Sequence, residues 1–118
     1  LKDKKKGKTK KILKKQIVKV LDKTFDPKKL IVAYEPIWSI GTGMIPSSSE
    51  LVKTVTYIKQ VLKNMYKGKK IPAVLYGGSV DEKNINQLKN ITTIDGFLIG
   101  GASRSSKKFI DIIKNYYR

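Results

Sequence analysis

The most informative segment of this chain is Ala33-Tyr34-Glu35-Pro36-Ile37-Trp38-Ser39-Ile40-Gly41-Thr42-Gly43. Residues 30–34 form a nearly continuous apolar run of strand length, which is typical of a buried parallel strand. Glu35 ends this strand, Pro36 prevents its continuation, and the two glycines allow the backbone of the following loop to swing. A carboxylate at the carboxyl end of a strand, beneath a mobile loop, is where an α/β enzyme would hold a general base.

Glu35 has two interpretations from the sequence. A glutamate at the end of a strand is usually solvated and has no special role. The neighbours Tyr34 and Trp38 favour catalysis, because partial burial suits a carboxylate to proton abstraction. Trp38, Ile40 and Met44 are either plain anchors of the loop or, if the loop is a lid, the groups that exclude water when it closes.

Two glycine-centred turns follow, each between a predicted strand and a predicted helix. They are Tyr76-Gly77-Gly78-Ser79 and Gly96-Phe97-Leu98-Ile99-Gly100-Gly101-Ala102-Ser103. A single glycine pair is explained equally well by the need for a tight turn. Two successive pairs at the same end of neighbouring parallel strands favour a phosphate site, because backbone N–H groups and helix N-termini attract anions.

Helix and strand patterns alternate along the chain. Apolar residues at helical spacing predict helices over about 9–24, 46–67, 79–88 and 105–116, and apolar runs predict strands over 30–34, 71–76 and 94–99. The spacings Ser47/Glu50 and Ser79/Glu82 match a capping box at the second and third helices. The order α-β-α-β-α-β-α predicts a parallel sheet with right-handed crossovers.

The predicted helices have apolar faces that we expect to be buried. These faces consist of Ile12, Leu13, Ile17, Val20 and Leu21; of Leu51, Val52, Val55, Ile58, Leu62 and Met65; of Ile85 and Leu88; and of Phe109, Ile112, Ile113 and Tyr116.

The net charge of +17 by itself suggests nucleic acid or another anionic surface as a partner. Almost all basic residues are lysines, and Arg104 and Arg118 are the only arginines. Because nucleic-acid interfaces prefer the bidentate fork of arginine, we favour solvated lysines, of which residues 2–15 hold the densest cluster. The chain has neither cysteine nor histidine, which excludes disulfides, thiolate or histidine metal ligands and histidine acid–base chemistry within it.

A length of 118 residues predicts a single domain over residues 1–118. No apolar run approaches the roughly 18 residues that a membrane span needs, so we expect no membrane partner. The chain starts at Leu1 without a methionine or a signal peptide, and we expect it to continue a longer sequence.

The stretch 33–43 and the two glycine turns, in this order and spacing, resemble triose-phosphate isomerase, and the resemblance covers essentially the whole chain. It implies an α/β fold that is the C-terminal part of a (β/α)₈ TIM barrel, with strands and helices similar to strands six to eight and helices five to eight. A complete barrel needs about 250 residues. The resemblance therefore implies a partial domain from a split, truncated or incomplete gene product.

The resemblance also implies roles for individual residues. Glu35 would be the catalytic base, and the backbone of Gly41, Ser79, Gly100 and Gly101 would hold the substrate phosphate. The closing lid would comprise Pro36, Ile37, Trp38, Ser39, Ile40, Gly41, Thr42 and Gly43. Ser39 stands where alanine is common in the family. The family's active-site lysine and electrophilic histidine have no counterpart in this chain.

The family interconverts dihydroxyacetone phosphate and glyceraldehyde 3-phosphate in glycolysis and gluconeogenesis, by proton transfer through an enediolate. The resemblance implies no metal and no organic cofactor, a cytoplasmic location, and a homodimer for the full-length enzyme. We expect a phosphorylated triose as substrate, the missing N-terminal half of the barrel as partner, and no activity from this chain alone. The alternatives are a basic RNA- or anion-binding module derived from a decayed enzyme fragment, and another phosphate-binding barrel enzyme, against which the Glu-Pro-Trp lid argues.

Overall fold

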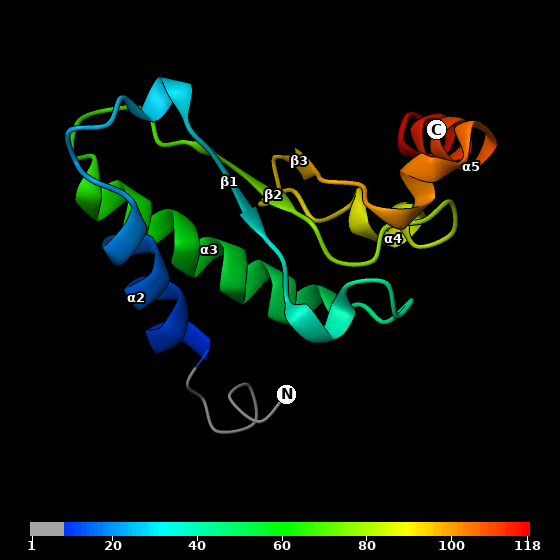
Figure 1. Ribbon diagram of the computed structural model, residues 1–118, viewed down its shortest axis with the longest axis horizontal. Helices are drawn as coiled ribbons and strands as arrows, with labels where there is room; N and C mark the ends of the chain where they lie inside the picture. The colour runs from blue at the N-terminus through cyan, green and yellow to red at the C-terminus, as the bar shows by residue number, and fades with distance from the viewer. Residues whose placement is uncertain (1–8) are drawn as a thin grey trace.

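The computed structural model describes residues 9–118, so residues 2–8 of the predicted basic cluster lie outside the described residues. The predicted alternation of helices and strands is confirmed (Figure 1). The elements in order are α2 (Thr9–Val20), η1 (Pro27–Lys29), β1 (Ile31–Tyr34), η2 (Ile37–Ser39), α3 (Ser48–Met65), β2 (Ala73–Tyr76), α4 (Ile85–Leu88), β3 (Gly96–Phe97), η3 (Gly101–Arg104) and α5 (Ser106–Tyr116).

The three strands form one parallel sheet in the order β1-β2-β3. Ile31 of β1 pairs with Ala73 of β2, and Leu75 of β2 pairs with Gly96 of β3. β3 is shorter than the predicted strand 94–99, partly because the carboxylate of Asp95 accepts a hydrogen bond from the Val74 N–H at 2.8 Å. The Val74 N–H is thus bonded to a side chain, and it cannot also pair with the backbone of a longer β3.

Helices α2 and α3 cover one face of this sheet, and α4 and α5 lie beyond β3 at its other end (Figure 1). Side chains alternate between the two faces of a strand. Val74 is fully buried against α3, and Val32 and Tyr34 are packed against the same cluster. The members of this cluster from α3 and its C-cap are Val55, Ile58, Leu62 and Tyr66.

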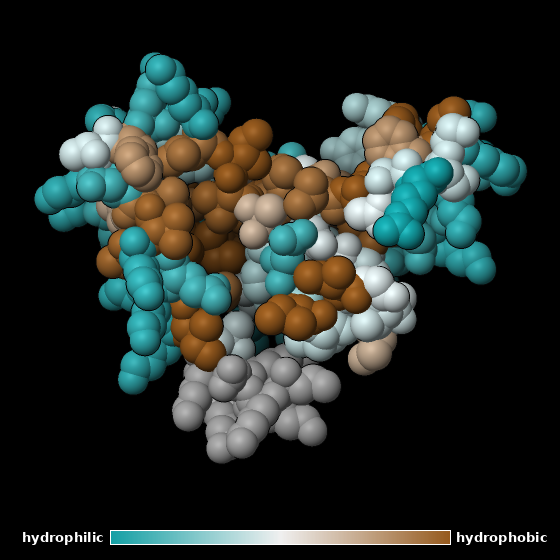
Figure 2. All heavy atoms as spheres, in the orientation of Figure 1, coloured by the Kyte–Doolittle hydropathy of each residue, from teal (hydrophilic) through white to brown (hydrophobic). Residues whose placement is uncertain are grey.

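The opposite face of β1 is open, and the prediction of a strand buried on both faces is wrong. Ile31 is 70% exposed, and Ala33 is exposed as well. Both point away from α3, and β1 is an edge strand beyond which residues 9–118 supply no further strand. Figure 2 shows apolar side chains gathered over the middle of the molecule between hydrophilic margins. An edge strand with an uncovered apolar face is what an incomplete barrel would present.

The helix boundaries and faces differ from the predictions in detail. α2 ends at Val20 rather than at residue 24, because the Asp22 carboxylate accepts a hydrogen bond from the Thr24 N–H at 2.8 Å and forms a turn there. Of the residues expected to be buried, Val20 and Val52 are exposed, and in α5 only Ile112 is buried. Without the rest of a barrel these helices have fewer neighbours to pack against.

One of the two predicted capping boxes forms. The Ser47 hydroxyl accepts a hydrogen bond from the Glu50 N–H at 3.2 Å and caps α3. The prediction of a capping box at Ser79 and Glu82 is wrong, since α4 begins only at Ile85. The Ser79 hydroxyl bonds to the loop after β1 instead, which leaves it unable to cap a helix.

Candidate active site

Glu35 follows β1 directly and lies on the open face of the sheet, on the same side as Ile31 and Ala33. Its side chain is exposed, so the expected partial burial is wrong. Tyr34 points to the opposite face and packs into both apolar clusters, so it cannot shield the carboxylate of Glu35. The carboxylate is thus presented at the carboxyl end of the sheet, open to a reacting molecule.

Gly77 lies beside Glu35 at the same end of the sheet. The Gly77 N–H donates to the carbonyl oxygen of Tyr34 at 2.8 Å and continues the pairing of β1 with β2 by one residue. A methyl group at position 77 would come 2.7 Å from Cγ of Glu35. The absence of a side chain at Gly77 therefore makes the space in which Glu35 lies.

The predicted lid, residues 36–43, contains one turn of 3₁₀ helix, η2, followed by two glycines. Gly41 and Gly43 have φ angles of 68° and 76°, a left-handed conformation that favours glycine. Ile37 is 88% exposed, and Ile40 and Met44 are about half exposed. Ile40 and Met44 therefore do not serve as anchors of the loop in this structure.

Hydrogen bonds fasten the lid to the turn that follows β2. The Gly43 N–H donates to the Ser79 hydroxyl at 3.0 Å, and that hydroxyl donates to the carbonyl oxygen of Ser39. The Ser39 hydroxyl lies 2.8 Å from the hydroxyl of Tyr76 and accepts a bond from the Ser79 N–H at 3.2 Å. The structure thus brings the lid and the first glycine turn into contact, and both segments contain predicted site residues.

The second glycine turn lies at the same end of the sheet. Gly100 precedes η3, which starts at Gly101, and both glycines are exposed. The Leu98 N–H donates to the carbonyl oxygen of Tyr76 at 3.0 Å, so the chain leading to this turn runs beside the end of β2. Nothing lies within 4 Å of a methyl group placed on either glycine, so their backbones face open space.

Two tyrosines end the neighbouring strands β1 and β2: Tyr34 is partly buried and Tyr76 is fully buried. Burial raises the pKa of Tyr76, and the hydrogen bond with Ser39 opposes this rise. Burial also raises the pKa of Tyr34, with smaller contributions from Tyr76 and Glu50. A neutral Tyr76 hydroxyl keeps its proton as a donor for Ser39.

A cavity of about 470 Å³ opens beside Glu35 and Trp38, between β1, α2 and α3. Lys10 and Lys53 line it, but the glycines and the serine expected to hold phosphate do not. The cavity therefore does not bring Glu35 together with the residues expected to hold phosphate. No group of three or more histidine, cysteine, aspartate or glutamate side chains in residues 9–118 is placed to hold a metal ion.

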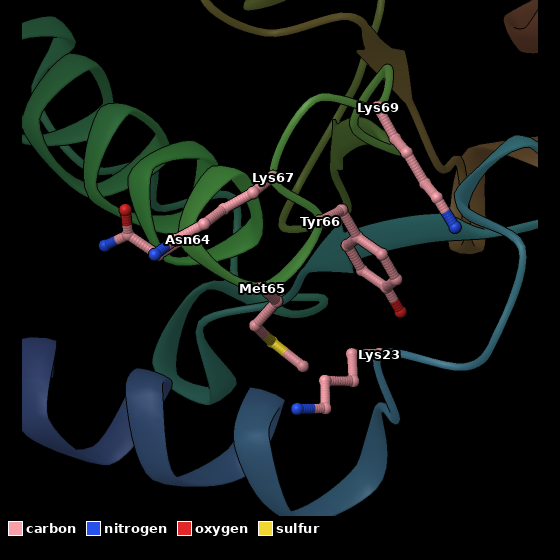
Figure 3. A pocket seen from close by; sticks show the side chains of 6 residues that line it. All are labelled: Lys23, Asn64, Met65, Tyr66, Lys67 and Lys69. Atoms are coloured by element: carbon pink, nitrogen blue, oxygen red, sulfur yellow. The ribbon is translucent and has the colours of Figure 1, made fainter.

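A basic pocket of about 340 Å³ lies at the opposite end of α3 (Figure 3). Its lining comprises Lys23, Asn64, Met65, Tyr66, Lys67 and Lys69. The side chains of Lys23 and Lys69 extend in different directions in Figure 3 rather than toward a common point. Lysines at the carboxyl end of a helix are stabilised by its exposed carbonyl groups. No helix in the described part of the chain is long and apolar enough to cross a membrane.

Two features of the site are absent from the sequence-based prediction. The first is the contact of Gly77 with Glu35, although the double glycine after a strand marks the position. The second is the buried hydroxyl pair of Ser39 and Tyr76, whose only sequence signal is a serine within an otherwise apolar part of the loop.

The comparisons with known proteins agree on one family. The family model described as triosephosphate isomerase matches residues 1–116. The triosephosphate isomerase of Dehalococcoides mccartyi is 40% identical over 110 residues, which are 92% of this chain and 43% of that protein. That of Mycoplasma mobile is 43% identical over 108 residues, which are 92% of this chain and 42% of that protein.

The structural comparison gives the same answer. The crystal structure of triosephosphate isomerase from Bartonella henselae superposes with a TM-score of 0.83 at 26% sequence identity, over 99% of this chain and 46% of that one. The chain spans less than half the length of these relatives, and its fold is the C-terminal part of their TIM barrel. The chain belongs to the triosephosphate isomerase family.

Proposed function

We propose that this chain, completed by an N-terminal half of the barrel, interconverts dihydroxyacetone phosphate and glyceraldehyde 3-phosphate. The proposal rests on the family and on one observation above all. Glu35 stands at the carboxyl end of β1, beside a lid that is hydrogen-bonded to the glycine turn after β2. A carboxylate, a lid and a glycine turn within one edge of a parallel sheet suit proton abstraction from a phosphorylated substrate.

In the proposed reaction Glu35 takes a proton from one substrate carbon and returns it to the neighbouring carbon through an enediolate. This exchange moves a hydrogen without net oxidation of the molecule, so it needs neither a metal nor an organic cofactor. The exposed position of Glu35 on the open face lets a substrate carbon reach its oxygens.

The backbone N–H groups of Gly41, Ser79, Gly100 and Gly101 would hold the phosphate. Gly100 precedes the 3₁₀ turn η3, Gly101 begins it, and α5 follows; helix N-termini favour anions. The Ser79 N–H donates to Ser39 at 3.2 Å, longer than the 3.0 Å bond from the Gly43 N–H to the Ser79 hydroxyl, so phosphate would replace that bond.

The chain has no histidine, and nothing in it matches the family lysine of the first strand-to-helix loop. We therefore propose that a complementary N-terminal half supplies both groups and pairs with the exposed edge of β1. Preorganised donors of this kind are typically worth about 10²–10³ in rate each. The 118-residue chain alone is expected to be inactive. We also propose, from the family alone, that the full-length enzyme is a homodimer with a cytoplasmic location.

The test is reconstitution. The chain is co-expressed with the N-terminal half of one of the relatives above, and isomerase activity is measured for the complex and for each half. Activity of the complex, with no activity of either half by itself, supports the proposal. A well-folded complex without activity contradicts it, and submicromolar RNA binding at physiological salt would favour the basic-module alternative instead.

A further inference from the structure

Ser39 is fully buried, at 0% exposure, in a loop whose other residues are mostly exposed. It is the one polar side chain in residues 9–118 that is buried as a whole residue. A buried hydroxyl is unfavourable unless its hydrogen-bonding capacity is used. The partners of Ser39 therefore indicate what its hydroxyl does.

The hydrogen bonds of Ser39 use its full capacity of one donor and two acceptor sites. The hydroxyl donates to the carbonyl oxygen of Met44, within the same loop. Its two acceptor sites face the Ser79 N–H at 3.2 Å and the Tyr76 hydroxyl at 2.8 Å. Because the Ser39 proton is committed to Met44, the Tyr76 hydroxyl must be the donor of their shared bond.

The glycine at position 78 is required by this arrangement. A methyl group there would come 2.6 Å from the Ser39 hydroxyl oxygen and would overlap the Tyr76 hydroxyl. Gly77 and Gly78 thus have separate uses, since one makes room for Glu35 and the other for the hydroxyl pair.

We propose that Ser39 is a positioning residue that locks the lid to the β2–α4 turn through Tyr76 and Ser79. This inference rests on the proposed function. We call the hydrogen bonds of Ser39 to Tyr76 and Ser79 the lock, and they hold the lid against the turn before a phosphate binds. Ser39 does not touch the substrate. It acts by fixing the loop that carries Gly41 relative to the turn that carries Ser79.

Removal of the hydroxyl has two effects that can be separated. Ser39→Ala frees the lid, so the turnover number of the reconstituted enzyme should fall about 3–10-fold, the loss expected for a net hydrogen bond. The same substitution removes a competitor of phosphate for the Ser79 N–H. KM should therefore change by less than about twofold, because the weaker lid and the freed donor act in opposite directions.

Trp38 provides a readout that does not depend on activity. It is the only tryptophan of this chain, and it directly precedes Ser39. In a complex whose N-terminal half carries no tryptophan, acrylamide quenching of Trp38 should rise in Ser39→Ala and in Tyr76→Phe, and no further in the double variant. The matched control is Ser49→Ala, an exposed serine, which should leave quenching and turnover unchanged.

The proposal is overturned if Ser39→Ala matches Ser49→Ala in both readouts, or if the effects of Ser39→Ala and Tyr76→Phe simply add. If Ser39→Ala does not fold, Tyr76→Phe removes the same bond from the other side and decides the question by the same criteria. Increased Trp38 quenching in an inactive complex would support the lock while contradicting the isomerase function.

Discussion

Glu35 and Gly77 lie in contact across two neighbouring strands, so that a methyl group on Gly77 would come 2.7 Å from Cγ and 3.0 Å from Oε1 of Glu35. The contact follows from the register of the sheet. Tyr34 pairs with Tyr76, and the residues after them therefore leave the strands side by side on the open face. Gly77 sets the space available to the candidate base.

Gly77→Ala should misplace Glu35 without unfolding the protein. The Cβ contact is closer than atoms tolerate, and the flexible Glu35 side chain is the group that can move. A displacement of about 1 Å can lower the rate about 10²-fold, so the turnover number of the reconstituted enzyme should fall about 10–10²-fold. Steady-state kinetics checks this, with Ser49→Ala as the control. An unchanged turnover number would show that Glu35 works from its displaced position.

Glu35→Gln keeps the size of the side chain and removes the base. Turnover by the reconstituted enzyme should fall about 10²–10⁴-fold, the usual contribution of a general base. The affinity for inorganic phosphate should change little, because backbone N–H groups are proposed to hold the anion. Glu82→Gln serves as the control, since no catalytic role is proposed for that residue. Normal turnover by Glu35→Gln would remove Glu35 from the mechanism.

The isolated chain should associate or remain molten. β1 is the edge strand of the sheet, with no strand on its outer side in residues 9–118, and Ile31 on the open face is 70% exposed. Exposed strand edges and apolar faces drive association. Size-exclusion chromatography and thermal melting of the 118-residue chain test this expectation. A monodisperse monomer with a sharp cooperative melt would contradict it.

The stability of the reconstituted complex should decrease at alkaline pH in a way that depends on Tyr76. Burial raises the pKa of Tyr76 and of Tyr34 above the ordinary value of 10.0. Above about pH 10 the unfolded chain loses these protons while the folded chain keeps them, so the free energy of unfolding falls as pH rises. Below that pH both states are protonated, and these groups cause no pH dependence.

Tyr76→Phe should make this alkaline decrease shallower, although it also removes the bond to Ser39 at every pH. Urea unfolding at several pH values above and below the ordinary tyrosine pKa measures both effects. Equal slopes in the wild type and in Tyr76→Phe would show that Tyr76 titrates alike in the folded and unfolded states.

The order of helices and strands, the parallel sheet and the family were all predictable from the amino-acid sequence. These depend on local patterns that survive in a partial chain, such as apolar runs, the proline after Glu35 and the glycine turns. The cap of α3 at Ser47 was predictable for the same reason, because it needs only residues within one turn.

The burial of individual apolar residues and the contacts of the polar ones depend on the folded arrangement of the chain. The exposure of Ile31 depends on whether a neighbouring strand exists, which no local pattern records. The Ser79 hydroxyl bonds to Ser39 across 40 residues instead of capping the next helix, and Gly77 meets Glu35 through strand register. Such contacts arise from the packing of distant segments, so the spacing of residues along the chain cannot reveal them.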